Sequence, residues 1–267
     1  MGIKDNPKFT VTVLGSGSCV PLKERYPSSY FICPRLVPSG WLVDVGSGAI
    51  QRLIDVGKSH LEIECVFISH VHPDHISDLL PLLQALNYTP GFKRTDPFYI
   101  YGSEDIKKYL DFNMELALPL TADFPMEFVL LKDKMKLEKD GWSLEVRSLK
   151  HPAKTLGFRW NIEGCILVYG ADTGPCEGIS KLAKDADLLI LECSFLKDNP
   201  KHHHLTTYQA GEIAKNAGVK KLLLSHFYPE VLEIKKEEKE KEVRESGYKG
   251  EIIFAEDLMF IEVYLQE

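Results

Sequence analysis

The chain has 267 residues, 44% of them hydrophobic, and carries a formal net charge of −7 at pH 7. This length and apolar content suffice to bury a full core, and a single domain over residues 1–267 is the simplest organisation. The net negative charge argues against a protein that must neutralise many phosphates of a nucleic acid. No apolar run reaches the length of a membrane span, no signal peptide opens the chain, and the six cysteines show no close pairing. We therefore expect a cytoplasmic protein with reduced thiols and no membrane partner.

Short runs rich in β-branched and aromatic residues alternate with helical patterns, and no internal repeat or linker separates them. The runs predict strands over residues 9–14, 30–33, 41–45, 65–69, 97–101, 128–131, 144–149, 165–169, 188–192, 221–225, 252–255 and 259–265. The helical patterns predict helices over residues 49–56, 76–86, 103–112, 178–183, 207–217 and 230–244. Residues 116–125, with prolines among apolar residues, form either a lid over a cleft or a packed surface loop.

The most informative segment is an apolar run that ends in His70, His72, Asp74 and His75. Side chains of an extended segment alternate between faces, so His70 and His72 leave the strand end on the same side. Pro73 stops the strand, so Asp74 and His75 point from the start of the next element towards a neighbouring point. One loop could therefore supply ligands to two adjacent metals. The alternative is a solvated polar turn, which would rarely carry such a cluster by chance.

Three further candidate ligands stand where predicted strands end. His151 follows one such strand and precedes a proline, Asp172 ends the run 165–171, and His226 ends the run 221–225. Taken singly, each is better explained as a core histidine whose hydrogen bonds are made within the protein, or as an aspartate in a turn. Together with the His/Asp cluster, they supply the additional ligands that a two-metal site requires.

With these residues the chain resembles the metallo-β-lactamase-fold hydrolase superfamily, in the branch of the tRNA 3'-processing endonucleases (RNase Z) and the smaller cyclic-nucleotide phosphodiesterases. The matching stretches run in the family's order from residue 10 to 226, and the His/Asp signature is specific for the superfamily. They are Leu14-Gly15-Ser16-Gly17-Ser18, Leu42-Val43-Asp44-Val45-Gly46, the segment from His70 to His75, His151 with Gly157-Phe158-Arg159, Gly170-Ala171-Asp172-Thr173, Leu191-Glu192, His204-Leu205-Thr206 and Ser225-His226. The resemblance implies an α+β protein with a four-layer αββα sandwich.

The resemblance also implies a binuclear metal site in which Asp172 bridges the two ions. One ion would be held by His70, His72 and His151, and the other by Asp74, His75 and His226. Two metals about 3.5–4 Å apart can share a hydroxide that attacks phosphorus. Mixed imidazole and carboxylate ligands suit two zinc ions, with manganese or iron as alternatives. Asp44 either supports a ligand histidine or bonds nearby amides.

Two residues outside this shell match the leaving-group acid of the branch. The resemblance assigns His204 to protonate or stabilise the departing oxygen and Glu192 to support it, alongside Asp74 among the catalytic residues. Thr206 to Gln209 fits a capping box, so a helix should begin there and direct its amides towards the loop that carries His204. For His202 and His203, a solvated loop is an equally good interpretation.

The substrate that the sequence favours is a small or cyclic nucleotide-type phosphodiester. Typical tRNA endonucleases of the branch carry a long arm, often between the positions of His151 and Asp172, and only twenty residues separate these two here. One alternative is an RNase Z-like endonuclease without the usual arm, or with a short one in residues 89–95. A second alternative is a thioester or lactone hydrolase of the same fold, against which His204 with Glu192 argues. RNA is the less favoured partner, and the sequence leaves a homodimer open.

Overall fold

The computed structural model describes residues 6–37, 39–116 and 124–265, and contains two seven-stranded mixed sheets. The first sheet has the order β14-β1-β2-β3-β4-β5-β6 and comprises β1 (Phe9–Gly15), β2 (Ser29–Pro34), β3 (Gly40–Val45), β4 (Ile63–Phe67), β5 (Phe98–Gly102), β6 (Met126–Leu130) and β14 (Phe260–Val263). The second has the order β13-β12-β11-β10-β9-β8-β7 and comprises β7 (Lys136–Lys139), β8 (Trp142–Ser148), β9 (Leu156–Ile162), β10 (Cys165–Tyr169), β11 (Leu188–Glu192), β12 (Lys221–Ser225) and β13 (Glu251–Phe254).

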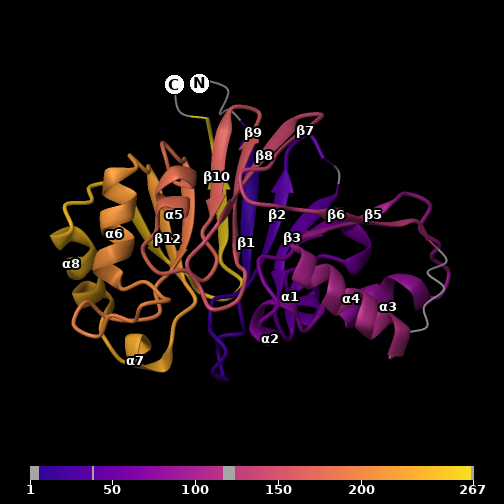
Figure 1. Ribbon diagram of the computed structural model, residues 1–267, viewed down its shortest axis with the longest axis horizontal. Coiled ribbons are helices and arrows are strands. Elements are labelled where there is room, and N and C mark those ends of the chain that lie inside the picture. The colour runs from indigo at the N-terminus through magenta and orange to yellow at the C-terminus, as the bar shows by residue number, and fades with distance from the viewer. Residues whose placement is uncertain (1–5, 38, 117–123, 266–267) are drawn as a thin grey trace.

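The helices form two outer layers, one on each side of the sheet pair, as Figure 1 shows. Those beside the first sheet are α1 (Ala49–Asp55), α2 (Pro73–Ile76), α3 (Leu79–Tyr88) and α4 (Glu104–Leu116), with a short 3-10 turn η1 (His60–Glu62) before β4. Those beside the second sheet are α5 (Glu177–Leu182), α6 (Thr207–Asn216), α7 (Pro229–Leu232) and α8 (Lys236–Glu245). This arrangement is the αββα sandwich that the family resemblance implies.

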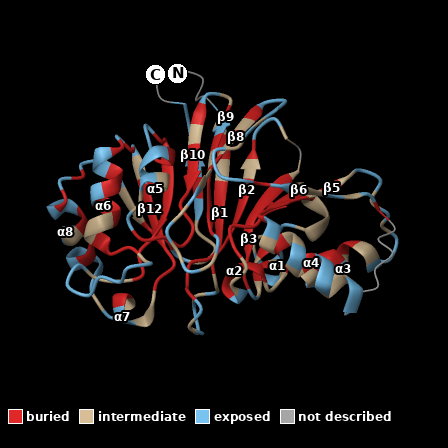
Figure 2. Cartoon of the chain, viewed as in Figure 1, coloured by how far each residue is buried: buried red, intermediate tan, exposed pale blue. Residues whose placement is uncertain are grey.

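Apolar side chains from both sheets meet in the middle of the sandwich and form its main core. Large rings from β3, β4, β8 and β9 interlock there: Trp41 and Trp142 have ring centroids 4.8 Å apart, and Phe67 meets Trp160 edge to face at 5.2 Å. A second core fills the space between the first sheet and helices α1, α3 and α4. Figure 2 shows the consequence, with strands buried and the outward faces of the helices exposed. The two sheets therefore form one rigid platform, which suits the placement of a site at their edge.

Most predicted elements lie within one to three residues of their observed positions, but two strands were missed. β7 is a charged run that pairs with β8 only, and β9 contains Gly157 and Arg159, which weaken its strand pattern. β9 forms because it pairs on both edges, with β8 and with β10. The sheet context therefore outweighs the local propensity.

One helix prediction was wrong: residues 230–244 form two helices, α7 and α8, instead of one. The backbone of Lys235 is extended between them, with φ −59° and ψ 146°. The Lys239 ammonium donates a hydrogen bond to the carbonyl of Val231, which satisfies that acceptor without a continuous helix. Of residues 116–125, for which the sequence left a lid and a packed surface loop open, residues 117–123 lie outside the described part of the chain. Within the described ranges, no helix has the length and apolar character needed to cross a membrane.

Candidate metal centre

The candidate ligands gather because parallel neighbouring strands end at the same edge of a sheet. β10, β11 and β12 are parallel neighbours, and Asp172, Glu192 and His226 stand at or just beyond their carboxyl ends. In the first sheet, β4 ends three residues before His70, and the short helix α2 then presents Asp74 and His75. In α/β sheets the carboxyl edge of parallel strands is the usual place for a site. Here two such edges, one from each sheet, face each other.

The first group of candidate ligands consists of His70, His72 and His151, whose ring nitrogens converge. Nδ1 of His72 lies 3.0 Å from Nε2 of His70 and 3.1 Å from Nε2 of His151. One carboxylate oxygen of Asp172, Oδ2, lies 4.0 Å from Nε2 of His70 and 3.8 Å from Nε2 of His151. Four potential donor atoms thus surround one point.

The second group consists of Asp74, His75 and His226, on the other side of Asp172. The Oδ1 atom of Asp172 lies 3.3 Å from Nε2 of His75 and 3.3 Å from Nε2 of His226. Asp74 Oδ2 lies 3.6 Å from Nε2 of His75 and 3.4 Å from Nε2 of His226. Asp172 therefore turns one oxygen to each group, which is the arrangement of a carboxylate that bridges two ions.

The chemistry of these donors fits a pair of divalent cations. Burial lowers the pKa of His70 and lowers that of His151 to about 4, so both imidazoles are neutral at pH 7, the form that binds metal. His75 Nε2 and Asp172 Oδ1 are buried and have no hydrogen-bond partner. Unpaired buried polar atoms are costly, and a bound cation would satisfy both. The donor set is therefore suited to zinc-type coordination.

Asp44 holds two of the candidate ligands from beneath. Its carboxylate is fully buried and lies 2.7 Å from Nδ1 of His75, from the Ser69 amide nitrogen and from the Ser69 hydroxyl. The Tyr169 hydroxyl also donates to it, at 2.6 Å. The Ser69 hydroxyl in turn lies 2.9 Å from Nδ1 of His70. In neutral His75, a proton on Nδ1 that bonds to Asp44 directs the Nε2 lone pair towards the site. Both roles considered for Asp44 in the sequence are thus present.

The backbone beneath the site adopts an unusual conformation at three strand ends. Asp44, Ala171 and His226 have positive φ angles of 52°, 41° and 56°. Side chains other than glycine rarely adopt this left-handed region, and such residues concentrate at functional sites. Here the sharp turns direct Asp172 and His226 inwards as soon as their strands end.

Glu192 and His204 lie beside the second group. Nδ1 of His204 is 3.0 Å from each carboxylate oxygen of Glu192, and Glu192 also accepts a hydrogen bond from the Thr173 amide. Burial lowers the pKa of His204, but the hydrogen bond from His204 to Glu192 and the charge of Glu192 outweigh it, so the pKa is raised. The predicted capping box is present, since Thr206 and Gln209 bond each other's backbone amides at the start of α6.

Sequence reasoning missed Ser194, whose hydroxyl connects Glu192 to the candidate ligand His226. It donates to Glu192 and lies 3.0 Å from Nδ1 of His226. Ser194 was not recognised because a serine two residues after a strand end carries no pattern of its own. His202 and His203 are exposed in the loop, and the backbone carbonyl of His203 lies 3.2 Å from Nδ1 of His151.

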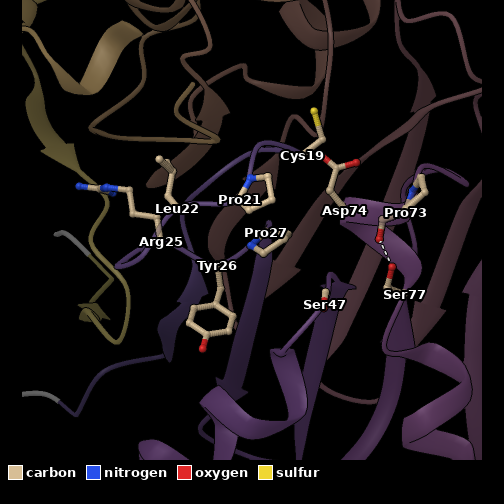
Figure 3. Close-up of a pocket in the computed structure, with 10 residues that line it drawn as sticks. All are labelled: Cys19, Pro21, Leu22, Arg25, Tyr26, Pro27, Ser47, Pro73, Asp74 and Ser77. Carbon is tan, nitrogen blue, oxygen red and sulfur yellow. Dashed lines mark hydrogen bonds between the residues drawn. The ribbon is translucent and has the colours of Figure 1, made fainter. Parts of the chain in front are cut away.

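Two hollows flank the donor groups. One, of about 580 Å³, is lined by Asp74 together with Cys19, Leu22 and Tyr26, as Figure 3 shows. The other, of about 720 Å³, is lined by His151 together with Lys132 and Lys154. A substrate with a group on each side of the reacting atom could therefore extend into both.

Comparisons with known proteins agree with this geometry. The sequence model of the Beta-lactamase superfamily domain matches residues 42–227. The Ribonuclease Z of Limosilactobacillus reuteri is 29% identical over 272 residues, covering 80% of this chain and 86% of that protein. The metallo-beta-lactamase fold protein YhfI from Bacillus subtilis superposes with a TM-score of 0.81, at 25% identity and with 97% of this chain and 100% of that chain covered.

A further solved structure has the same fold. The short form of human tRNase Z superposes with a TM-score of 0.77, at 24% identity over 96% of this chain and 100% of that chain. The family match covers the His/Asp signature, the strands that carry Asp172 and Glu192, and His226. The chain therefore belongs to the metallo-β-lactamase-fold superfamily of metal-dependent hydrolases, in its RNase Z-like branch.

Proposed function

We propose that this single domain, residues 1–267, is a phosphodiesterase of the RNase Z type that uses two metal ions to cleave an RNA phosphodiester bond. The observation that carries the proposal is the position of the His204–Glu192 pair beside two donor groups that share Asp172. An acid next to a two-metal site is what a diester needs, because its leaving alkoxide must be protonated. A binding protein would need neither.

In this proposal the chain's own residues divide into two sets. His70, His72 and His151 would hold one ion, Asp74, His75 and His226 would hold the other, and Asp172 would serve both. The two metal ions, when bound, supply Lewis acidity and an activated water for attack at phosphorus. Zinc is the metal best suited to these ligands, and manganese or iron would bind the same donors.

His204 acts on the leaving group. Its Nδ1–H donates to Glu192, so Nε2 is the atom that carries a proton towards the cleft. The negative charge of Glu192 stabilises the protonated imidazole until the proton is transferred. Ser194 links Glu192 to Nδ1 of His226, and so fixes the orientation of both side chains.

The RNA substrate is supported by the relatives that carry the ribonuclease Z name, which favour the endonuclease alternative over the small phosphodiester that the sequence alone suggested. A small or cyclic phosphodiester remains the second candidate substrate, and one observation favours it. The interval between His151 and Asp172 is occupied by the β9–β10 hairpin, and residues 89–95 form a loop in which the Arg94 guanidinium donates to the carbonyl of Ile63. Neither segment is free to form a long arm.

The relative from Limosilactobacillus reuteri contains residues that have no counterpart in this chain. Its matched region spans 272 residues, more than the whole of this 267-residue chain, although only 80% of the chain is matched. The alignment therefore contains segments that this chain lacks. A protein without an arm would bind fewer phosphates along an RNA body, which is the physical reason to test small and cyclic nucleotide diesters beside RNA.

The test is a substrate panel on purified, zinc- or manganese-loaded protein. It includes a precursor tRNA with a 3' trailer, 2',3'-cyclic nucleotides, bis(p-nitrophenyl) phosphate and a thioester, with Asp172→Asn as the inactive control. Cleavage of the precursor at a single position supports the RNase Z proposal. Turnover of cyclic nucleotides with an intact precursor replaces it with the small-diester function. Turnover of the thioester alone would exclude both.

A further inference from the structure

We infer that the hollow beside Asp74, here called the Asp74 pocket, is a subsite for a nucleobase of the nucleotide joined to the scissile phosphate. The inference rests on the proposed phosphodiesterase function and specifies what the site recognises. Besides Asp74, its lining includes Cys19, Leu22, Arg25, Tyr26 and Ser77.

The pocket opens directly beside the candidate metal ligands. Asp74 belongs to both, and Figure 3 shows Asp74 and Cys19 among the residues that line the pocket. A group in the pocket is therefore within one nucleotide of the atom that the metals would act on. The pocket volume of about 580 Å³ lies within the range of about 300–1,000 Å³ that is usual for small-molecule sites.

The walls of the pocket suit a flat, uncharged group better than a second phosphate. Three prolines, Leu22 and the Tyr26 ring supply apolar surface. The only lining cation, Arg25, already donates from one guanidinium nitrogen to the Ser16 hydroxyl and to the Ala255 carbonyl, and its guanidinium lies 5.1 Å from the centroid of the Phe227 ring. A base combines an apolar face with polar edges, which Ser47, Ser77 and Cys19 could meet.

A hydrogen bond joins the pocket to Tyr228, an aromatic residue beside His204 and His226. The Cys19 sulfur lies 3.3 Å from the hydroxyl of Tyr228. The Tyr228 ring packs nearly parallel to Phe195 at 5.2 Å, and its centroid is 5.9 Å from the ring of His226 and 6.0 Å from that of His204. Tyr228 thus connects Cys19, which lines the pocket, to the rings of His204 and His226.

The first test measures binding without hydrolysis, so that it remains informative if the proposed reaction is wrong. Cys19 is the one exposed thiol of the six cysteines, and its alkylation by iodoacetamide reports on access to the pocket. The rate is measured on metal-loaded protein with adenosine or uridine 5'-monophosphate, with ribose 5-phosphate and with inorganic phosphate. Cys19→Ser gives the background from the other cysteines.

We expect the mononucleotides to slow alkylation of Cys19 at least fivefold, and ribose 5-phosphate and phosphate to leave it unchanged. Equal protection by ribose 5-phosphate would overturn the inference, because the base would then contribute nothing. Absence of protection by any nucleotide at millimolar concentration would overturn it as well.

The second test compares two diesters that differ only in the group next to phosphorus. In thymidine 5'-p-nitrophenyl phosphate that group is a nucleoside, and in methyl p-nitrophenyl phosphate it is a methyl group. Leu22→Ala should raise KM for the thymidine ester about 5- to 10-fold and leave the methyl ester unchanged. Leu36→Ala, at an exposed leucine outside the pocket lining, is the matched control. Equal losses on both esters, or no loss on either, would contradict a base subsite.

Discussion

Both carboxylate oxygens of Glu192 lie 3.0 Å from Nδ1 of His204, and the Glu192 carboxylate also accepts the Ser194 hydroxyl that contacts His226. The candidate acid and a candidate metal ligand are therefore held by one buried carboxylate. Glu192 thus orients both the candidate proton donor and a candidate metal ligand. Substitutions at His204 and at the metal ligands should therefore separate proton transfer from metal binding.

Replacing His204 by alanine should lower kcat for RNA or a nucleoside diester about 10²- to 10⁴-fold, because the departing oxygen loses its proton donor. The loss should be much smaller for a p-nitrophenolate leaving group, which needs no protonation. Steady-state kinetics on the two substrate types measure the difference. Metal analysis of the variant should give the wild-type content, and loss of an ion would instead make His204 a ligand.

Asp172→Asn should abolish binding of at least one ion, since each Asp172 oxygen faces a different donor group. Metal content after dialysis measures this directly. The wild-type protein should gain thermal stability when zinc is added, by the mass-action effect of a ligand that binds only the folded state, and the variant should gain less. Asp187→Asn is the matched control, because Asp187 is buried just before β11, away from the donor groups, and pairs with Lys220. A variant that keeps two ions would argue against bridging.

Asp44→Asn should weaken the ion held by His75 about 10- to 100-fold, and the ion held by His70 less, because Asp44 reaches His70 only through the Ser69 hydroxyl. The neutral amide no longer favours the proton on Nδ1 of His75, so the lone pair at Nε2 is less available. Competitive titration with a zinc chelator resolves the two affinities. Asp78→Asn serves as control, because Asp78 bonds the amide of Ile50 at the start of α1 and does not contact the candidate ligands. Equal weakening in both variants would indicate a general loss of stability.

If RNA is the substrate, Lys132→Ala and Lys154→Ala should each raise KM for RNA severalfold and reduce the slope of log affinity against log salt by about 1. Both lysines are exposed and line the hollow beside His151. A small diester should show no such change, because it does not reach a second phosphate. Lys241→Ala, on the distant helix α8, is the control for net charge. Unchanged RNA binding in both lysine variants would place the RNA path elsewhere.

The sequence by itself determined the candidate ligands and most of the strands. The period-two side-chain pattern and Pro73 locate the signature at a strand end, and buried runs such as Cys165–Tyr169 and Lys221–Ser225 have the bounds that the pattern predicts. Local chemistry suffices for these features, because alternation, proline and capping residues act within a few positions.

Only the tertiary structure decided how these residues meet. Asp172 presents one carboxylate oxygen to each donor group because segments from both sheets meet at one edge of the sandwich, a relation that no local pattern encodes. Ser194, the Cys19–Tyr228 bond and the Asp74 pocket depend on residues far apart in the chain. The β9 strand likewise forms through its two neighbours, and α7 ends where Lys239 binds the Val231 carbonyl. Long-range contacts of this kind follow from packing, and the sequence pattern alone does not contain them.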